Sequence, residues 1–238
     1  KNNKDYIKPD SNLSYADNFM HMLDDSIEVT PLISRIIDAT LILHAEHTIN
    51  ASTFTSMVTS STLASPTQVI ASAIGSLSGP LHGGANHKVI LMLDDMGSKN
   101  NARAWLEERL SRKQVVWGMG HREYSTKDPR ANILTEMVKD LFKEQSGKVS
   151  DMFEKAMELE KACEEKLAKK GVYANVDFYS GILYKEIGIP VDLFTPIFAI
   201  SRTSGWLAHW IEQVSNNKIF RPTQIYTGHN NRKYNSKG

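Results

Sequence analysis

The residues best suited to chemistry lie at breaks between helical segments. Histidine, aspartate and arginine recur there beside glycine, proline or asparagine. The clusters are His44-Ala-Glu-His47, Gly79-Pro-Leu-His82-Gly-Gly-Ala-Asn86, Gly118-Met-Gly-His121 continuing to Asp128-Pro-Arg130, Asn175-Val-Asp177, and Arg202. Histidine and carboxylate transfer protons near neutral pH, and arginine binds carboxylates through a charged fork. Each cluster also has a plain structural interpretation.

Metal binding and helix termination are the two interpretations of His44 and His47, which are three residues apart and hence expected on one helix face. Two histidines supply only half of a zinc site, so we favour a histidine that serves the helix C-terminus.

His82 lies between Pro80 and two glycines. A side chain there projects near unsatisfied N–H groups, and glycine lets a ligand approach the backbone closely.

The other clusters are equally open when taken singly. His121 follows a Gly-x-Gly pattern that lacks the preceding strand and third glycine of a dinucleotide fingerprint. Asp177 could be a loop or helix-cap residue. Arg202 lies in an apolar helical segment, where its charge is costly unless a protein carboxylate or a ligand neutralises it. No single cluster identifies a reaction.

Helices are predicted to position these residues. Thr30-Pro31, Ser65-Pro66, Asp128-Pro129 and Thr195-Pro196 are start signals, and Ser150 opens a long amphipathic helix. Its apolar stripe is Met152, Ala156, Leu159, Cys163 and Leu167, and Gly171 is placed to end it. Strand signals are few, with at most a short extended piece in 171–178. The fold class is therefore predicted to be all-α.

Composition narrows the function further. Among 238 residues, 28 basic side chains balance 27 acidic ones, which gives no reason to expect a nucleic-acid partner. No apolar run is long enough for a membrane-spanning helix. The single cysteine, Cys163, excludes an internal disulfide and fits a reducing cytoplasm. The polar start without methionine predicts an internal fragment of a longer protein.

Taken together, the clusters resemble the signature blocks of the citrate synthase family, in the family's order, over about Leu13 to Gly228. The blocks are 41–53, 79–86, 118–122, 128–131, 175–177, 201–202 and 221–222. The resemblance implies a large helical domain and a smaller one that closes over the active site. It assigns 1–83 and 189–238 to the large domain and 84–188 to the small domain, with part of the large domain preceding Lys1.

The implied reaction joins acetyl-CoA to oxaloacetate, with coenzyme A thioester as a substrate and no permanently bound cofactor or metal. Asp177 is similar to the family's catalytic base, and His82 to the donor that stabilises the enolate. His121 matches the histidine that polarises the ketone, and His47 matches one that hydrogen-bonds the same substrate. No direct role is carried over to His44.

Arginines complete the implied substrate and subunit contacts. Arg130 and Arg202 match the pair that clamps the oxaloacetate carboxylates. Arg221 matches the arginine that reaches the partner's site in a homodimer, with the helices in 54–78 at the interface. The implied CoA-binding residues are Trp117, Gly118, Met119, Gly120, Arg122 and Lys127.

The loop after His121 departs from the family pattern. Relatives commonly continue His-Arg-Val-Tyr-Lys, whereas this chain has His121-Arg-Glu-Tyr-Ser125, and His87 stands where relatives usually have glutamate. Glu123 adds a negative charge and Ser125 removes a positive one, so phosphate binding is expected to weaken.

Three other functions remain open. A 2-methylcitrate synthase would use propionyl-CoA with the same residues, and one methylene is worth only about 1–3 kcal/mol of discrimination. A non-catalytic relative would be kept for binding or structure. A histidine-based metal protein would need a further ligand beside His44 and His47.

Overall fold

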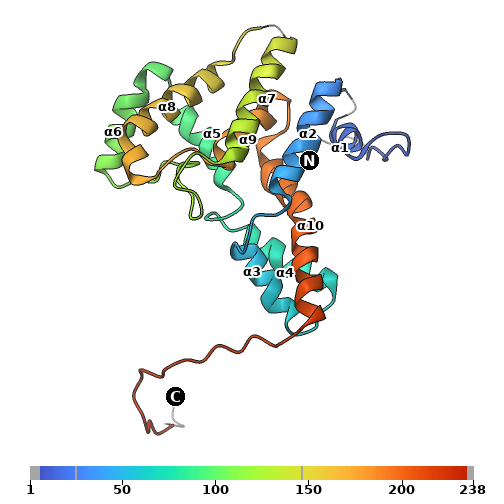
Figure 1. The fold of residues 1–238 in the computed structure, drawn as a ribbon, viewed down its shortest axis with the longest axis vertical. Coiled ribbons are helices and arrows are strands. Elements are labelled where there is room, and N and C mark those ends of the chain that lie inside the picture. The colour runs from blue at the N-terminus through green and yellow to red at the C-terminus, as the bar shows by residue number, and fades with distance from the viewer. Residues whose placement is uncertain (1–5, 25, 146, 235–238) are drawn as a thin grey trace.

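The computed structural model describes residues 6–24, 26–145 and 147–234. Helices dominate this part of the chain, and no strand occurs in it, so the all-α prediction is confirmed (Figure 1). The α-helices are α1 (Tyr15–Leu23), α2 (Pro31–Ala45), α3 (Ala51–Ser60), α4 (Pro66–Leu77), α5 (Ala85–Met96), α6 (Ala102–Ser111), α7 (Pro129–Gln145), α8 (Asp151–Leu167), α9 (Val176–Glu186) and α10 (Phe194–Ser215). Short 3-10 turns, η1 (Lys99–Asn101), η2 (Ala168–Lys170) and η3 (Val191–Leu193), adjoin α6, α8 and α10.

Hydroxyl side chains begin several helices as predicted. Thr30 Oγ1 accepts from the Ile33 N–H, and Ser150 Oγ accepts from the Phe153 N–H at 3.1 Å. These bonds satisfy amides that the first helical turn leaves unpaired. The Thr195-Pro196 start signal needs a correction, because α10 already begins at Phe194. The Thr195 hydroxyl instead donates to the Gly83 carbonyl at 2.8 Å and ties α10 to the segment before α5.

The helices form a broad upper body and a narrower arm (Figure 1). In the body, α5 to α9 pack around one apolar core, to which α1, α2 and the start of α10 also contribute. In the arm, α3 and α4 pack against the later part of α10, with Trp206 fully buried between them. The main core joins Ile36 on α2 to Phe178 on α9, so segments on both sides of the predicted domain boundary share it.

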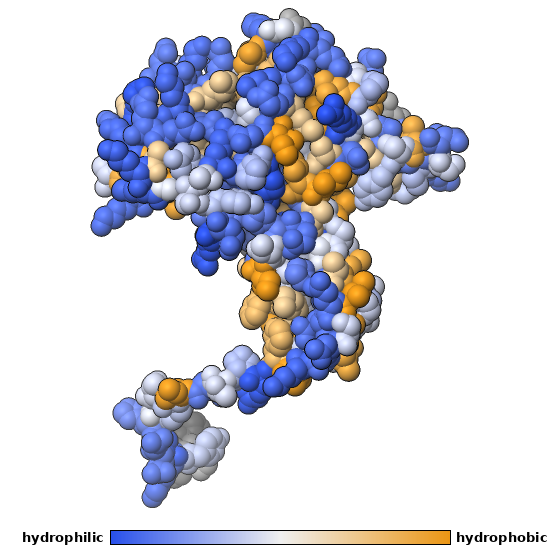
Figure 2. Space-filling model, viewed as in Figure 1, coloured by the Kyte–Doolittle hydropathy of each residue, from blue (hydrophilic) through white to orange (hydrophobic). Residues whose placement is uncertain are grey.

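Apolar side chains are unevenly distributed over the surface. Figure 2 shows orange patches along the arm, whereas the region of α6 and α8 is mostly blue. Phe54 and Leu63 on the arm are 53% and 68% exposed. Within the described ranges, no helix is long and apolar enough to cross a membrane.

Candidate active site

An inner cavity of about 150 Å³ brings together residues from five separate parts of the chain. Most of the lining groups are polar, and six of them were predicted as site residues. The lining is His47, Asn50, His82, His121, Arg130, Asn175, Val176, Asp177, Phe198 and Arg202. The loops after α2 and before α5, the loop before α7, and helices α7, α9 and α10 therefore converge on one point.

Backbone hydrogen bonds hold the loop with His121 against the segment that leads into α9. The Gly120 N–H donates to the Tyr173 carbonyl at 2.7 Å, and the Asn175 N–H donates to the Gly118 carbonyl at 2.9 Å. Gly118 has a φ of 76°, and a Cβ there would lie 2.8 Å from the Phe178 Cα. Only glycine combines that backbone angle with so close an approach. The predicted extended piece is limited to one bridge between Met119 and Ala174.

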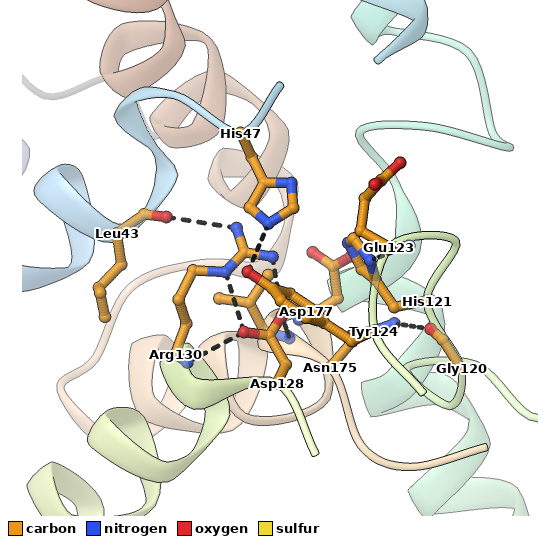
Figure 3. Close-up of polar contacts among 11 residues, drawn as sticks. Leu43, His47, Gly120, His121, Glu123, Tyr124, Asp128, Arg130, Asn175 and Asp177 are labelled. Carbon is orange, nitrogen blue, oxygen red and sulfur yellow. Dashed lines mark hydrogen bonds and ion pairs between the residues drawn. The ribbon is translucent and has the colours of Figure 1, made fainter. Parts of the chain in front are cut away.

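Asp128 joins the beginnings of α7 and α9 (Figure 3). Its carboxylate accepts from Arg130 Nε at 3.1 Å and Nη2 at 2.7 Å, and from the Val176 N–H at 3.2 Å. Burial alone would raise the pKa of Asp128, but the hydrogen bonds and charge of Arg130 hold the pKa below its ordinary value. The ionised carboxylate thus fixes Arg130 and the first turn of α9, which carries Asp177.

Arg202 is a buried cation, with only 2% of its surface exposed. Its Nε donates to the His44 carbonyl at 2.7 Å, while Nη1 has no hydrogen-bond partner. No carboxylate forms an ion pair with Arg202 in the described part of the chain. Burial lowers the pKa of its guanidinium to about 10. The guanidinium also lies 4.8 Å from the centre of the Phe198 ring, and an anion that enters the cavity would supply the ion pair that Arg202 lacks in the described part of the chain.

Asp177 lies in the first turn of α9, behind the Asn175 side chain that caps the helix. Asn175 Oδ1 accepts from the Asp177 N–H at 3.0 Å. Burial raises the pKa of Asp177 to about 6, against the opposing influence of Arg130. A carboxylate with a pKa near the working pH is well suited to remove a weakly acidic proton.

Backbone amides donate to the rings of His82 and His121. His82 Nε2 contacts both the Ser52 N–H at 3.3 Å and Ser52 Oγ at 2.8 Å. Because the backbone amide can only donate, Nε2 accepts, and we place the proton of the neutral ring on Nδ1. The Glu123 N–H donates to His121 Nδ1 at 3.0 Å, so that ring carries its proton on Nε2. Burial, followed by Arg202, lowers the pKa of His82 to about 4. Burial and Arg130 also lower the pKa of His121.

The shared helix face predicted for His44 and His47 is wrong, whereas His44 does lie in the last turn of its helix as predicted. Because α2 ends at Ala45, His47 lies beyond the helix and the two rings share no helix face. His44 is buried, and its Nδ1 bonds the Thr40 carbonyl at 2.8 Å in the last turn of α2. His47 lines the cavity instead, and burial lowers its pKa. No group of three potential metal ligands occurs among the residues that the structure describes.

An outer groove of about 420 Å³ adjoins the inner cavity and shares His47, His82, His121 and Asp177 with it. Of the predicted CoA-binding residues, Trp117, Gly118, Met119, Gly120 and Arg122 line this groove, and so does Glu123. Lys127 does not line it. Its Nζ instead pairs with Glu160 at 2.6 Å and lies 5.3 Å from the centre of the Tyr179 ring.

Arg221 lies outside both cavities. It is exposed in the extended C-terminal segment that follows α10, which projects away from the arm in Figure 1. The segment begins against α3, where the Phe220 N–H donates to Ser61 Oγ at 3.1 Å and its ring contacts Phe54. In this chain, the inner cavity is therefore formed without Arg221.

Sequence reasoning missed several groups that hold the site. Asn50 caps α3 and lines both cavities, while Ser52 receives the Trp206 indole N–H at 3.2 Å and contacts His82. Tyr124 bonds His47. Asn50 could have been found from the sequence, because an asparagine directly before a helical segment is a typical N-cap residue and this one lies three residues after His47. Ser52 and Tyr124 had none, since the histidines that they hydrogen-bond, His82 and His47, are distant in sequence.

Comparisons with known proteins identify the family of the chain. A family model described as citrate synthase, C-terminal domain, matches residues 1–223. A citrate synthase of Acidithiobacillus ferridurans is 53% identical over 97% of this chain and 59% of its own length. The chain thus spans about three fifths of that relative.

Solved structures give the same result. The crystal structure of citrate synthase from Thermotoga maritima has a TM-score of 0.87 and 40% identity, over 97% of this chain and 62% of its own. A citrate synthase from Thermoplasma acidophilum, in a ternary complex with carboxymethyl coenzyme A and oxaloacetate, has a TM-score of 0.87 and 34% identity, over 95% of this chain and 60% of its own. On the family model and these likenesses, the chain belongs to the citrate synthase family.

Proposed function

We propose that the protein condenses acetyl-CoA with oxaloacetate and hydrolyses the resulting thioester to citrate and coenzyme A. The observation that carries the proposal is the inner cavity, where a carboxylate of raised pKa faces neutral histidines and two arginines. A dianion of four carbons suits the two guanidinium groups, because Arg202 has no carboxylate partner among the described residues and Arg130 has donors beyond those held by Asp128.

The chemistry follows from the protonation states. Asp177, when ionised, removes a proton from the methyl group of acetyl-CoA. The Nδ1–H of His82 donates to the oxygen on which the enolate charge develops. The Nε2–H of His121 donates to the ketone oxygen of oxaloacetate, so that the ketone carbon is attacked and its oxygen takes up a proton. A carbon–carbon bond forms in citryl-CoA, and water then cleaves its thioester.

The outer groove supports a thioester as the second substrate. It opens directly beside His82 and Asp177, and residues Trp117 to Gly120 form part of its wall, where they would contact the nucleotide. The Thermoplasma acidophilum relative holds a coenzyme A derivative together with oxaloacetate. We therefore assign CoA to the groove and the keto-dicarboxylate to the inner cavity. Lys127 would contact CoA only after its ion pair with Glu160 is broken.

A second part of the proposal concerns movement and assembly. Residues 84–188 would form a small domain that closes on the large domain and excludes water. Two chains would associate through the arm of α3 and α4, which carries apolar patches (Figure 2). Phe54 and Leu63 are exposed there. Such a dimer would leave the segment with Arg221 free to reach the partner's site.

Cys163, buried and unpaired, supports a reducing cytoplasm as the location.

The deciding experiment measures thiol release by the full-length gene product with oxaloacetate and either acetyl-CoA or propionyl-CoA. We expect oxaloacetate-dependent release that is faster with acetyl-CoA. Faster release with propionyl-CoA would identify a 2-methylcitrate synthase. No release with either thioester, from a folded protein that binds oxaloacetate, would leave a non-catalytic relative and refute the proposal.

A further inference from the structure

Tyr124 contacts His47 and His121, two of the histidines that line the inner cavity. Its hydroxyl is 2.9 Å from His47 Nε2, and its ring centre is 4.8 Å from that of His121 and 5.4 Å from that of His47 (Figure 3). The two imidazoles are themselves 4.8 Å apart. Tyr124 is half-buried and lines neither cavity. It therefore supports both rings from behind.

His47 depends on such support because the backbone around it is irregular. It follows the end of α2, and Thr48 beside it has a φ of 54°. No helix or strand fixes this side chain, and within the described ranges the Tyr124 hydroxyl is the side-chain group that hydrogen-bonds its ring. A phenol is the better donor and a neutral imidazole the better acceptor. The bond thus places the ring proton of His47 on Nδ1.

His121 depends on the same loop. The Glu123 N–H holds its Nδ1, and the tilted Tyr124 ring covers one side of the imidazole. Residues 121–124 therefore set the orientation of two histidines, while 121–123 also line the outer groove.

We propose that Tyr124 is a positioning residue of the keto-acid site, which fixes the tautomer and orientation of His47 through its hydroxyl and buttresses His121 through its ring. This role rests on the proposed function, since it assumes that His47 and His121 meet the keto-dicarboxylate. The two parts of the side chain have separate tasks: the hydroxyl serves oxaloacetate binding, and the ring serves polarisation of the ketone.

Two variants separate these tasks in the full-length gene product. Tyr124→Phe removes the hydroxyl and keeps the ring, so we expect the KM for oxaloacetate to rise about five- to tenfold with kcat nearly unchanged, as for loss of one hydrogen bond. Tyr124→Leu also removes the ring and should in addition lower kcat about tenfold. Tyr15→Phe, at an exposed tyrosine on α1, is the matched control and should change neither.

Nitrogen-15 NMR of histidine-labelled protein tests the inference without turnover. The His47 signals, identified by their loss in His47→Gln, should show one neutral tautomer in the wild type and a mixture in Tyr124→Phe, with His82 unchanged. If the wild type releases no CoA, the proposed function fails, yet this tautomer shift still decides the role of Tyr124. An active Tyr124→Phe enzyme with unaltered KM and unaltered His47 signals would overturn the inference.

Discussion

The inner cavity and the outer groove adjoin each other, but their charged side chains differ in burial. In the cavity, Arg202 is buried without a carboxylate partner among the described residues, and Arg130 is held by Asp128. In the groove, the charged side chains Arg122 and Glu123 are exposed and of opposite sign. Under the proposed function, the small anion would therefore be recognised by buried, fixed groups, whereas the larger ligand would be recognised by groups that solvent screens.

The largest effect is expected at the base. Asp177→Asn keeps the shape of the side chain and the cap from Asn175 but cannot accept a proton, so kcat should fall about 10³-fold. Oxaloacetate affinity should be retained, because both arginines remain. Thiol release and calorimetric titration measure the two quantities. Asp151→Asn, at an exposed carboxylate on α8, is the control. A kcat within tenfold of the wild type would remove Asp177 from the mechanism.

Arg202→Met should weaken oxaloacetate binding about 10²-fold, the amount expected for lost charge-assisted hydrogen bonds. The melting temperature without ligand should stay the same or rise, because a buried cation without an ion-pair partner in the described chain is removed.

Calorimetry and thermal unfolding test this pair of outcomes. Arg109→Met on α6, which removes an arginine that stacks on Trp105, should leave oxaloacetate binding unchanged. A large loss of stability in Arg202→Met with binding intact would mean that Arg202 is structural and that the cavity is not an anion site.

The pH dependence should show which group limits the rate in acid. The pKa of Asp177 is raised to about 6 and the base works only when ionised, so kcat/KM should rise with pH and level off above about 6. Below that pH, the rate should fall tenfold per unit. The pKa of His82 is lowered to about 4, so His82 stays neutral over this range. If the fall of kcat/KM at low pH shifted to another pH in His121→Gln, the group that limits the rate in acid would be a histidine and not Asp177.

The smallest effect is expected in the groove. Glu123→Lys replaces a negative charge with a positive one near the proposed CoA phosphates, so the KM for acetyl-CoA should fall about threefold. The gain should shrink at high salt, because both groups are exposed. Glu108→Lys, at an exposed residue of α6, is the control. A KM that rises in Glu123→Lys would place the phosphates elsewhere.

The sequence predicted the helical fold because capping residues and apolar periodicity are local signals. Thr30 and Ser150 cap their helices as predicted. The family blocks likewise named six residues that line the inner cavity. Failures occurred where a distant partner decides the outcome. Thr195 bonds Gly83 instead of capping α10, and Lys127 pairs with Glu160 on α8. Neither contact could be predicted from residues nearby in the sequence.

One carboxylate holds both an arginine of the proposed substrate clamp and the helix that carries the proposed base. Asp128 accepts the side-chain fork of Arg130 and also the amide that begins the helix carrying Asp177. Under the proposed function, a substitution at Asp128 would therefore change substrate affinity and turnover together. An engineer who wishes to reshape the keto-acid pocket must leave Asp128 in place and work from the α10 side, where Phe198 and Arg202 have no part in the anchor.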